Sequence, residues 1–188
     1  LDDCYTALSW ASNSCNELLI DPARLGIFGL SAGAGLCAAL ALLSRDREGP
    51  RICFQYLGIP ELDDRLETPS MKLFTNTPIW DLELAKLSWT YYLGETYAPG
   101  ASNVPIYASP ARAEDLRELP STYISTMEFD PLRDEGILYA LRLMQQGVQT
   151  ELHSFPGTFH GSHFFAEAKI NQRAQQETLE ILRRGLSL

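Results

Sequence analysis

Residues Arg24 to Gly35 read RLGIFGLSAGAG, and this stretch decides the fold. The apolar run over Arg24–Phe28 predicts a short buried strand, and the almost wholly apolar run over Ala32–Ser44 predicts a buried helix. Ser31 stands between two glycines where the strand turns into the helix. In this context the G-x-S-x-G pattern favours a nucleophile elbow over an ordinary glycine-rich turn. Ser31 would then project from the edge of the sheet, with the Ala32 N–H free to donate to an oxyanion.

The rest of the chain continues the alternation of strands and helices. Three further strands are predicted, over Ile52–Leu57, Thr122–Thr126 and Thr150–Phe155. Helices are predicted over 1–19, over 77–94 with Thr77 as cap and Pro78 in the first turn, over Glu135–Gln146, and over about Phe164–Arg184. This alternation predicts an α/β fold of about four parallel strands with helices on both faces of the sheet. Ligands bind beyond the carboxyl ends of such strands, so the side chains that follow each strand are candidate site residues.

Composition narrows the class of protein. The chain has 188 residues, which suits one domain, and its net charge of −9 argues against nucleic acid as a partner. No apolar run is long enough to span a membrane, and no segment resembles a signal peptide. The four cysteines form no C-x-x-C pair and lie in apolar surroundings, which predicts reduced, buried thiols and a cytoplasmic location. They are Cys4, Cys15, Cys37 and Cys53.

A serine nucleophile needs a base and an acid that orients the base, and in the elbow fold these follow in the order serine, acid, histidine. The segment STYISTMEFDPLRDEG supplies the acid after the third strand. Asp130 lies in the loop and is the best candidate. Glu128 is close enough to the strand to point back toward the sheet, and Asp134 is placed to cap the next helix.

All three histidines lie in ELHSFPGTFHGSHFF. His160 follows the fourth strand in a loop, where an imidazole can reach the serine, and it is the predicted base. His153 alternates within the strand and is predicted to lie on a sheet face, whereas His163 begins the last helix as a surface group or a neighbour of the base. A metal site made by His160 and His163 is disfavoured, because no third ligand or HExxH-like pattern accompanies them.

The chain resembles the hormone-sensitive-lipase-like branch of the α/β-hydrolase esterases through nearly its whole length. The resemblance is carried by DPARLGIFGLSAGAG, PARAEDLRELPSTYI, EFDPLRDEG, YALRLMQQGVQTELHSFPG and FHGSHFF. It implies Ser31 as nucleophile, Asp130 as acid and His160 as base. It also implies hydrolysis of small carboxylic esters without a cofactor. Leu30, Ala34 and Ser162 depart from the usual motifs, and none of the three removes a catalytic group.

One motif of that family is absent from this sequence. The family places an HGGG loop upstream of the serine to supply most of the oxyanion hole, and this chain has none. The resemblance therefore implies that 1–188 is the C-terminal part of one catalytic domain, a truncated α/β-hydrolase fold that keeps Ala32 as its oxyanion donor. Within it, 61–109 is predicted to be a partial lid. Its aromatic residues are interpreted as lid or core without a site role; they are Trp80, Trp89, Tyr91 and Tyr92.

Two alternatives to an active esterase follow from the same residues. One is a ligand-binding protein of the hydrolase fold that does not turn its ligand over, and the other is an inactive fragment that retains the motifs. In a sheet without its earlier strands, Arg24–Phe28 would lie at an exposed edge, where pairing with a second chain is favoured. The sequence thus predicts a small-molecule ester as the partner, with self-association through that edge.

Overall fold

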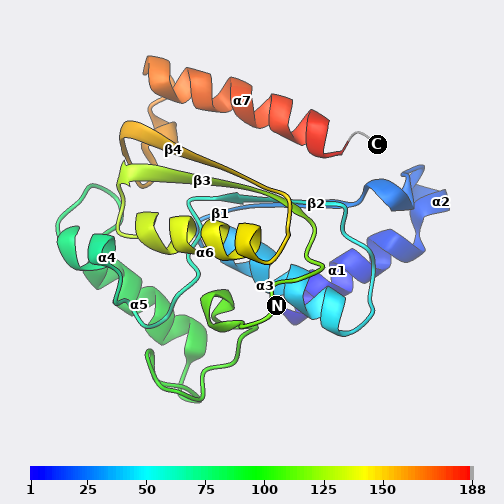
Figure 1. Cartoon of the computed structure of the whole chain (residues 1–188), viewed down its shortest axis with the longest axis horizontal. Helices are drawn as coiled ribbons and strands as arrows, with labels where there is room; N and C mark the ends of the chain where they lie inside the picture. The colour runs from blue at the N-terminus through cyan, green and yellow to red at the C-terminus, as the bar shows by residue number, and fades with distance from the viewer. Residues whose placement is uncertain (187–188) are drawn as a thin grey trace.

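The computed structural model describes residues 1–186 and is built on four parallel strands (Figure 1). Their order in the sheet follows their order in the chain, β1-β2-β3-β4, and each neighbouring pair is parallel. The strands are β1 (Gly26–Leu30), β2 (Phe54–Gly58), β3 (Ser121–Phe129) and β4 (Thr150–Phe159). All four carboxyl ends therefore meet at one edge of the sheet, and this confirms the predicted α/β fold class.

Helices cover both faces of the sheet, as predicted, and α7 lies alone on one face in Figure 1. The α-helices are α1 (Asp2–Asn13), α2 (Cys15–Leu18), α3 (Ala32–Asp46), α4 (Pro69–Leu73), α5 (Leu82–Leu93), α6 (Arg133–Gln145) and α7 (Lys169–Gly185). Short 3-10 turns occupy Pro22–Arg24, Pro110–Arg112 and Ser162–Phe164. The main core lies between the sheet and α1, α3 and α6, with Leu42, Leu57, Ile124 and Leu143 fully buried within it.

A smaller apolar layer fills the opposite face, beneath α7. There Phe54, Tyr56 and Tyr123 of the strands pack against Ile181 of α7. Phe28 of β1 stacks on Tyr56 with ring centroids 4.7 Å apart, yet Phe28 remains 49% exposed because β1 is an edge strand. Among the described residues β1 pairs only with β2, so one side of β1 has no ladder partner.

The strand boundaries differ from the predicted ones by one to three residues at β1, β2 and β3, and most at the end of β4. The sequence predicted a strand that ends at Phe155, before Pro156 and Gly157, but β4 continues through both to Phe159. Among the described residues β4 is the other edge strand, where a proline is tolerated. The pairing with β3 shifts register between Met127 and Phe129, which accommodates the irregularity.

Three predicted helix boundaries were wrong. The first helix breaks at Ser14, and Leu19 ends the short α2 in the left-handed conformation with φ of 55°. The helix expected from Pro78 begins at Leu82, because Asp81 caps it by accepting from the Leu84 N–H at 3.0 Å. The last helix begins at Lys169, after a 3-10 turn that takes up the residues before it.

The prediction of buried, unpaired cysteines is confirmed for two of the four. All four thiols are free, but only Cys15 and Cys37 are buried; Cys4 and Cys53 are half-buried.

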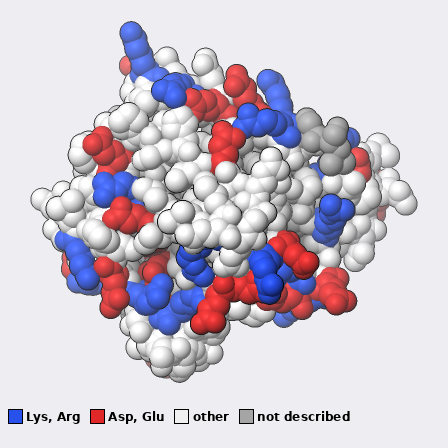
Figure 2. All heavy atoms as spheres, viewed as in Figure 1, with Lys and Arg blue, Asp and Glu red and all other residues white. Residues whose placement is uncertain are grey.

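Among residues 1–186 no helix combines the length and the apolar character that a membrane crossing needs. Figure 2 shows acidic and basic side chains interspersed on one face, around an uncharged central area.

Candidate active site

Ser31 occupies the sharp turn between β1 and α3. Its φ of 54° and ψ of −124° lie in a sparsely populated region for a residue with a side chain. The backbone at Gly33 passes so close to Gly29 that this position has no room for a side chain. An added Cβ on Gly29 would lie 2.2 Å from the Gly33 carbonyl oxygen. A Cβ on Gly33 would meet no atom within 4 Å, so close packing requires only the first glycine of the pattern. Gly35 is a second tight position, because an added Cβ there would lie 2.2 Å from the Glu61 carbonyl oxygen.

Ser31, His160 and Asp130 form one hydrogen-bonded chain across the carboxyl edge of the sheet. Ser31 Oγ lies 2.9 Å from His160 Nε2, and His160 Nδ1 lies 2.8 Å from Asp130 Oδ2. The second oxygen of Asp130 accepts from the Leu132 N–H at 2.9 Å. His160 is 5% exposed and Asp130 is 1% exposed, so water does not compete for these bonds. The structure thus joins the three residues that the sequence ranked first.

The competing acids have other partners. Glu128 accepts from the Gly157 N–H at 2.6 Å, which holds the irregular part of β4. The prediction that Asp134 caps α6 was wrong, because the first turn of that helix has no side-chain cap. Asp134 instead accepts from the Ser70 N–H at 2.7 Å and so ties α4 to α6.

The competing histidines also lie apart from Ser31. His153 pairs with Glu177 of α7 at 2.9 Å, on the sheet face where the sequence predicted it. His163 lies in the 3-10 turn after β4, and its ring is tilted against that of Phe164 with ring centroids 4.4 Å apart. His163 is exposed overall, but partial burial of its imidazole, with a smaller contribution from His160, lowers its pKa. No group of three or more histidine, cysteine or acidic side chains within residues 1–186 is arranged to hold a metal ion.

The N-terminus of α3 offers backbone donors beside Ser31. Ala32 is the first residue of this helix, and its N–H has no acceptor among the described residues. The N-terminal end of a helix carries partial positive charge, so an oxyanion near Ala32 would be stabilised by this N–H and by the helix dipole. Ala32 is therefore where the sequence predicted it, at the start of a 15-residue helix.

Two features of the site were not predicted from the sequence. The indole of Trp80 stacks on the imidazole of His160, with ring centroids 5.5 Å apart, whereas the sequence reading gave Trp80 no site role. A cavity of about 420 Å³ opens beside Ala32, and its lining includes Glu61, Ser88 and Trp89. Glu61 follows β2 directly, so its place after a parallel strand was the signal that could have found it.

Burial raises the pKa of Glu61 to about 7, because the carboxylate loses hydration in the protein interior. A hydrogen bond from Ser88 and the charge of His160 act in the opposite direction, and Asp130 adds to the rise. Glu61 therefore lies within electrostatic range of both His160 and Asp130. It changes protonation state near neutral pH, in a cavity next to the nucleophile candidate.

Comparisons with known proteins agree on one family. A family model described as alpha/beta hydrolase fold matches residues 1–164. The chain is 36% identical over 166 residues to the carboxylesterase NlhH of Mycobacterium tuberculosis, covering 88% of this chain and 52% of that protein. It is 36% identical over 160 residues to an arylesterase of Saccharolobus solfataricus, covering 84% and 50%.

Solved structures give the same result. A bacterial heroin esterase superposes with a TM-score of 0.97 at 56% identity, over 99% of this chain and 59% of that one. Esterase LipW of Mycobacterium marinum superposes with a TM-score of 0.89 at 37% identity, over 97% and 56%. The chain thus spans about half the length of the curated relatives it matches.

Proposed function

The chain belongs to the alpha/beta hydrolase fold family, and on this premise we propose that the protein is a serine carboxylesterase acting on small carboxylic esters. The observation that carries the proposal is the unbroken hydrogen-bonded chain from Asp130 through His160 to Ser31. Relatives named as carboxylesterase, arylesterase and heroin esterase support the reaction class.

In the proposed mechanism, Ser31 Oγ attacks the ester carbonyl while His160 Nε2 takes its proton. Asp130 accepts a hydrogen bond from His160 Nδ1–H, which holds the imidazole in the tautomer with a free Nε2 and stabilises the imidazolium that forms. His160 then gives the proton to the leaving alcohol. Water, activated by the same imidazole, hydrolyses the acyl-enzyme and restores Ser31.

The developing negative charge on the carbonyl oxygen is stabilised by the Ala32 N–H at the start of α3. Ser31 is held in its strained conformation by the tight turn at Gly29 and by three backbone hydrogen bonds to its carbonyl. The donors are the N–H groups of Ala34 at 3.0 Å, Gly35 at 3.2 Å and Glu61 at 3.3 Å. The nucleophile is thus positioned before substrate arrives, which lowers the reorganisation needed during the reaction. We propose that 61–109, which contains α4 and α5, covers this site as a partial lid.

Paired histidine variants test the proposed base. With p-nitrophenyl acetate as substrate, His160→Ala is expected to lower kcat by on the order of 10⁵-fold, since a triad loses most of its effect when one member is removed. His163→Ala, three positions along the chain, is the matched control and is expected to retain most of the activity. Equal losses in both variants, or the greater loss in His163→Ala, would contradict the assignment.

We also propose that two copies of the chain associate through β1. Its outer edge has no ladder partner among the described residues, and Phe28 and Leu30 are 49% and 40% exposed there. Light scattering is expected to give a mass that rises with concentration. Phe28→Lys, which puts a charge on the edge strand, is expected to restore the monomer mass; a wild-type monomer at every concentration would refute the proposal.

A further inference from the structure

Glu61 is an incompletely paired acidic group that lines the cavity beside the candidate site. It is 5% exposed, and its Oε2 accepts one hydrogen bond, from Ser88 Oγ at 3.1 Å. Its Oε1 is buried without any partner. The charges that act on its ionisation are those of His160 and Asp130. A buried polar atom left unpaired costs about 1–3 kcal/mol, so a ligand in the cavity that pairs with this oxygen would gain binding free energy.

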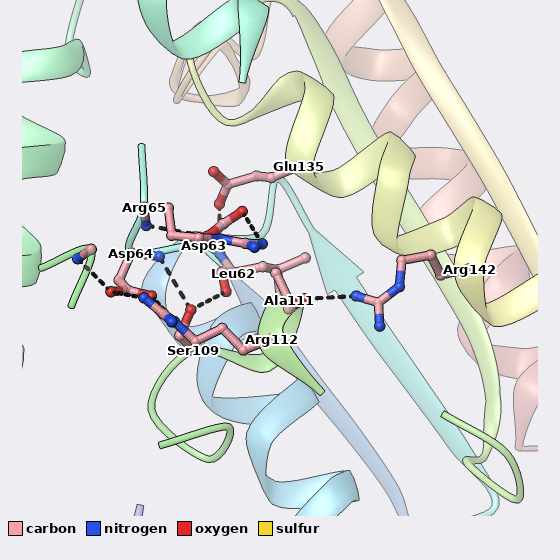
Figure 3. Close-up of polar contacts among 10 residues, drawn as sticks. Leu62, Asp63, Asp64, Arg65, Ser109, Ala111, Arg112, Glu135 and Arg142 are labelled. Atoms are coloured by element: carbon pink, nitrogen blue, oxygen red, sulfur yellow. Dashed lines mark hydrogen bonds and ion pairs between the residues drawn. The ribbon is translucent and has the colours of Figure 1, made fainter. Parts of the chain in front are cut away.

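The backbone around Glu61 is held on both sides, as Figure 3 shows for the residues that follow it. The Leu62 N–H donates to Glu135 Oε1 at 2.6 Å, and the Leu62 carbonyl accepts from Ser109 Oγ at 3.0 Å and from the Ala111 N–H at 3.1 Å. On the other side, the Glu61 N–H donates to the Ser31 carbonyl at 3.3 Å. The backbone on both sides of Glu61 is therefore fixed by hydrogen bonds, and Glu61 Oε1 lacks a partner within an ordered segment.

A second layer of ion pairs supports this segment. Asp64 accepts from Arg112 Nε at 2.6 Å and from Arg112 Nη2 at 2.9 Å, and it accepts from the Gly100 N–H at 2.7 Å. Arg142 of α6 donates to the Ala111 carbonyl at 2.6 Å, at the end of the same network in Figure 3. Asp64, Arg112 and Arg142 thus have partners, whereas one oxygen of Glu61 and one oxygen of Glu135 have none; of these two carboxyl groups, Glu61 is the one that lines the cavity.

Aromatic rings form the other part of the cavity. Trp89, Tyr91 and Tyr92 of α5 line it together with Glu61 and Ala32. Trp89 is 3% exposed and lies edge-on to Tyr92 with ring centroids 6.0 Å apart, whereas Tyr91 reaches the surface at 76% exposure. Aromatic faces attract cations through their quadrupoles, and a carboxylate adds direct charge complementarity. An alkylammonium group is the ligand chemistry that uses both.

We propose that Glu61, with the rings of Trp89 and Tyr92, forms a subsite for a positively charged nitrogen of the substrate. Because Ala32 lines the cavity and also follows Ser31, an ester carbonyl at Ser31 places its alcohol or acyl substituent near this subsite. The protein therefore prefers esters that carry an alkylammonium group over uncharged esters of the same shape. The inference rests on the proposed esterase function and names the substrate class for that site.

An isosteric pair of esters tests the charge preference. Acetylcholine and 3,3-dimethylbutyl acetate have the same shape, but one has a quaternary nitrogen where the other has a quaternary carbon. The ratio of their kcat/KM values therefore reports the effect of the positive charge alone. At pH 8 we expect the wild type to prefer acetylcholine by about tenfold, as a desolvated cation–aromatic contact with a carboxylate allows. Glu61→Gln is expected to bring the ratio close to one.

The matched control is Glu83→Gln, which removes a carboxylate from an exposed position of α5. It is expected to keep the wild-type preference. A wild-type ratio close to one, or a preference that survives in Glu61→Gln, would overturn the proposal. Circular dichroism of each variant checks that the fold is retained.

A binding experiment separates failure of the subsite from failure of the esterase proposal. Calorimetric titration of the Ser31→Ala variant with tetramethylammonium chloride, against sodium chloride at equal ionic strength, needs no turnover. We expect the Ser31→Ala variant to bind tetramethylammonium, and we expect the affinity to fall about tenfold when Glu61→Gln is added to it. Absence of binding overturns the subsite whatever the esterase assay gives, and binding without ester turnover upholds the subsite while refuting the esterase.

Discussion

Two buried carboxyl groups at the same edge of the sheet differ in how fully they are paired. Asp130, after β3, is 1% exposed, and both of its oxygens accept hydrogen bonds, from His160 and from the Leu132 N–H. Glu61, after β2, is 5% exposed, and one of its oxygens has no partner. A fully paired carboxylate can orient a neighbouring imidazole without ligand. An incompletely paired one retains a charge that a ligand can use, so pairing distinguishes the two roles better than burial does.

The largest expected effect comes from the paired group. Asp130→Asn is expected to lower kcat for p-nitrophenyl acetate by on the order of 10⁴-fold, because the amide favours the wrong tautomer of the base. Glu61→Gln is expected to leave the same kcat within about twofold, since the substrate is uncharged. Steady-state kinetics of the two variants measure the difference directly. Similar losses in both would show that pairing does not distinguish the two carboxyls.

A second prediction concerns stability and follows from the pKa of Glu61, which burial raises to about 7 from an ordinary value of 4.5. A group whose folded-state pKa is raised favours the folded state below its unfolded pKa, and that stability is lost as pH rises through the folded pKa. Relative to Glu61→Gln, the wild type should therefore lose up to roughly 3 kcal/mol of unfolding free energy between pH 4.5 and pH 8.

Urea unfolding of both proteins across this pH range measures the difference. His160 and Asp130 act on the ionisation of Glu61. The quantity to follow is therefore the difference in unfolding free energy between the wild type and Glu61→Gln at each pH, not the pH dependence of one protein alone. A constant difference from pH 4.5 to pH 8 would contradict the assigned cause. It would mean that the missing partner of Glu61 has no energetic consequence in the folded protein.

The smallest expected effect concerns the other neighbour of His160. Trp80 stacks on the imidazole, and such contacts are worth about 0.5–1.5 kcal/mol. Trp80→Leu should therefore lower kcat by about threefold to tenfold, far less than Asp130→Asn. Tyr91→Leu, which removes an exposed ring that lies apart from His160, is the control. A loss in Trp80→Leu as large as that in Asp130→Asn would shift the orienting role from the carboxylate to the indole.

The elbow and its two partner residues could be predicted because their signals are local. A glycine beside a strand end, a serine, and an acid and a histidine that each follow a later strand are visible in short stretches of sequence. Family membership was predicted from the same motifs and is confirmed. The catalytic roles of Ser31, Asp130 and His160 and the donor role of Ala32 remain proposals that agree with the geometry.

The cavity around Glu61 could not be predicted, because four segments distant in sequence build it: the loop after β2, the start of α3, one face of α5 and the loop at Ala108. Trp89 and Tyr92 are three residues apart, a spacing that a helix shows whether its aromatic face packs into the core or lines a cavity. The periodicity alone therefore could not distinguish these two roles. The start of α5 was misplaced for a related reason. Thr77 and Asp81 are both residue types that cap helices, but in the structure Thr77 donates to the Trp80 carbonyl and Asp81 accepts from the Leu84 N–H.

The central claim is that Ser31 is the nucleophile and that Asp130 and His160 activate it, and covalent labelling tests it most directly. A fluorophosphonate reacts with an activated serine and leaves one adduct, which mass spectrometry locates in the digested protein. We predict a single adduct on the peptide that contains Ser31, no adduct in Ser31→Ala, slower labelling in Asp130→Asn, and an unchanged rate in Glu61→Gln. Labelling that persists in Ser31→Ala, or that is equally fast in Asp130→Asn, would contradict the claim.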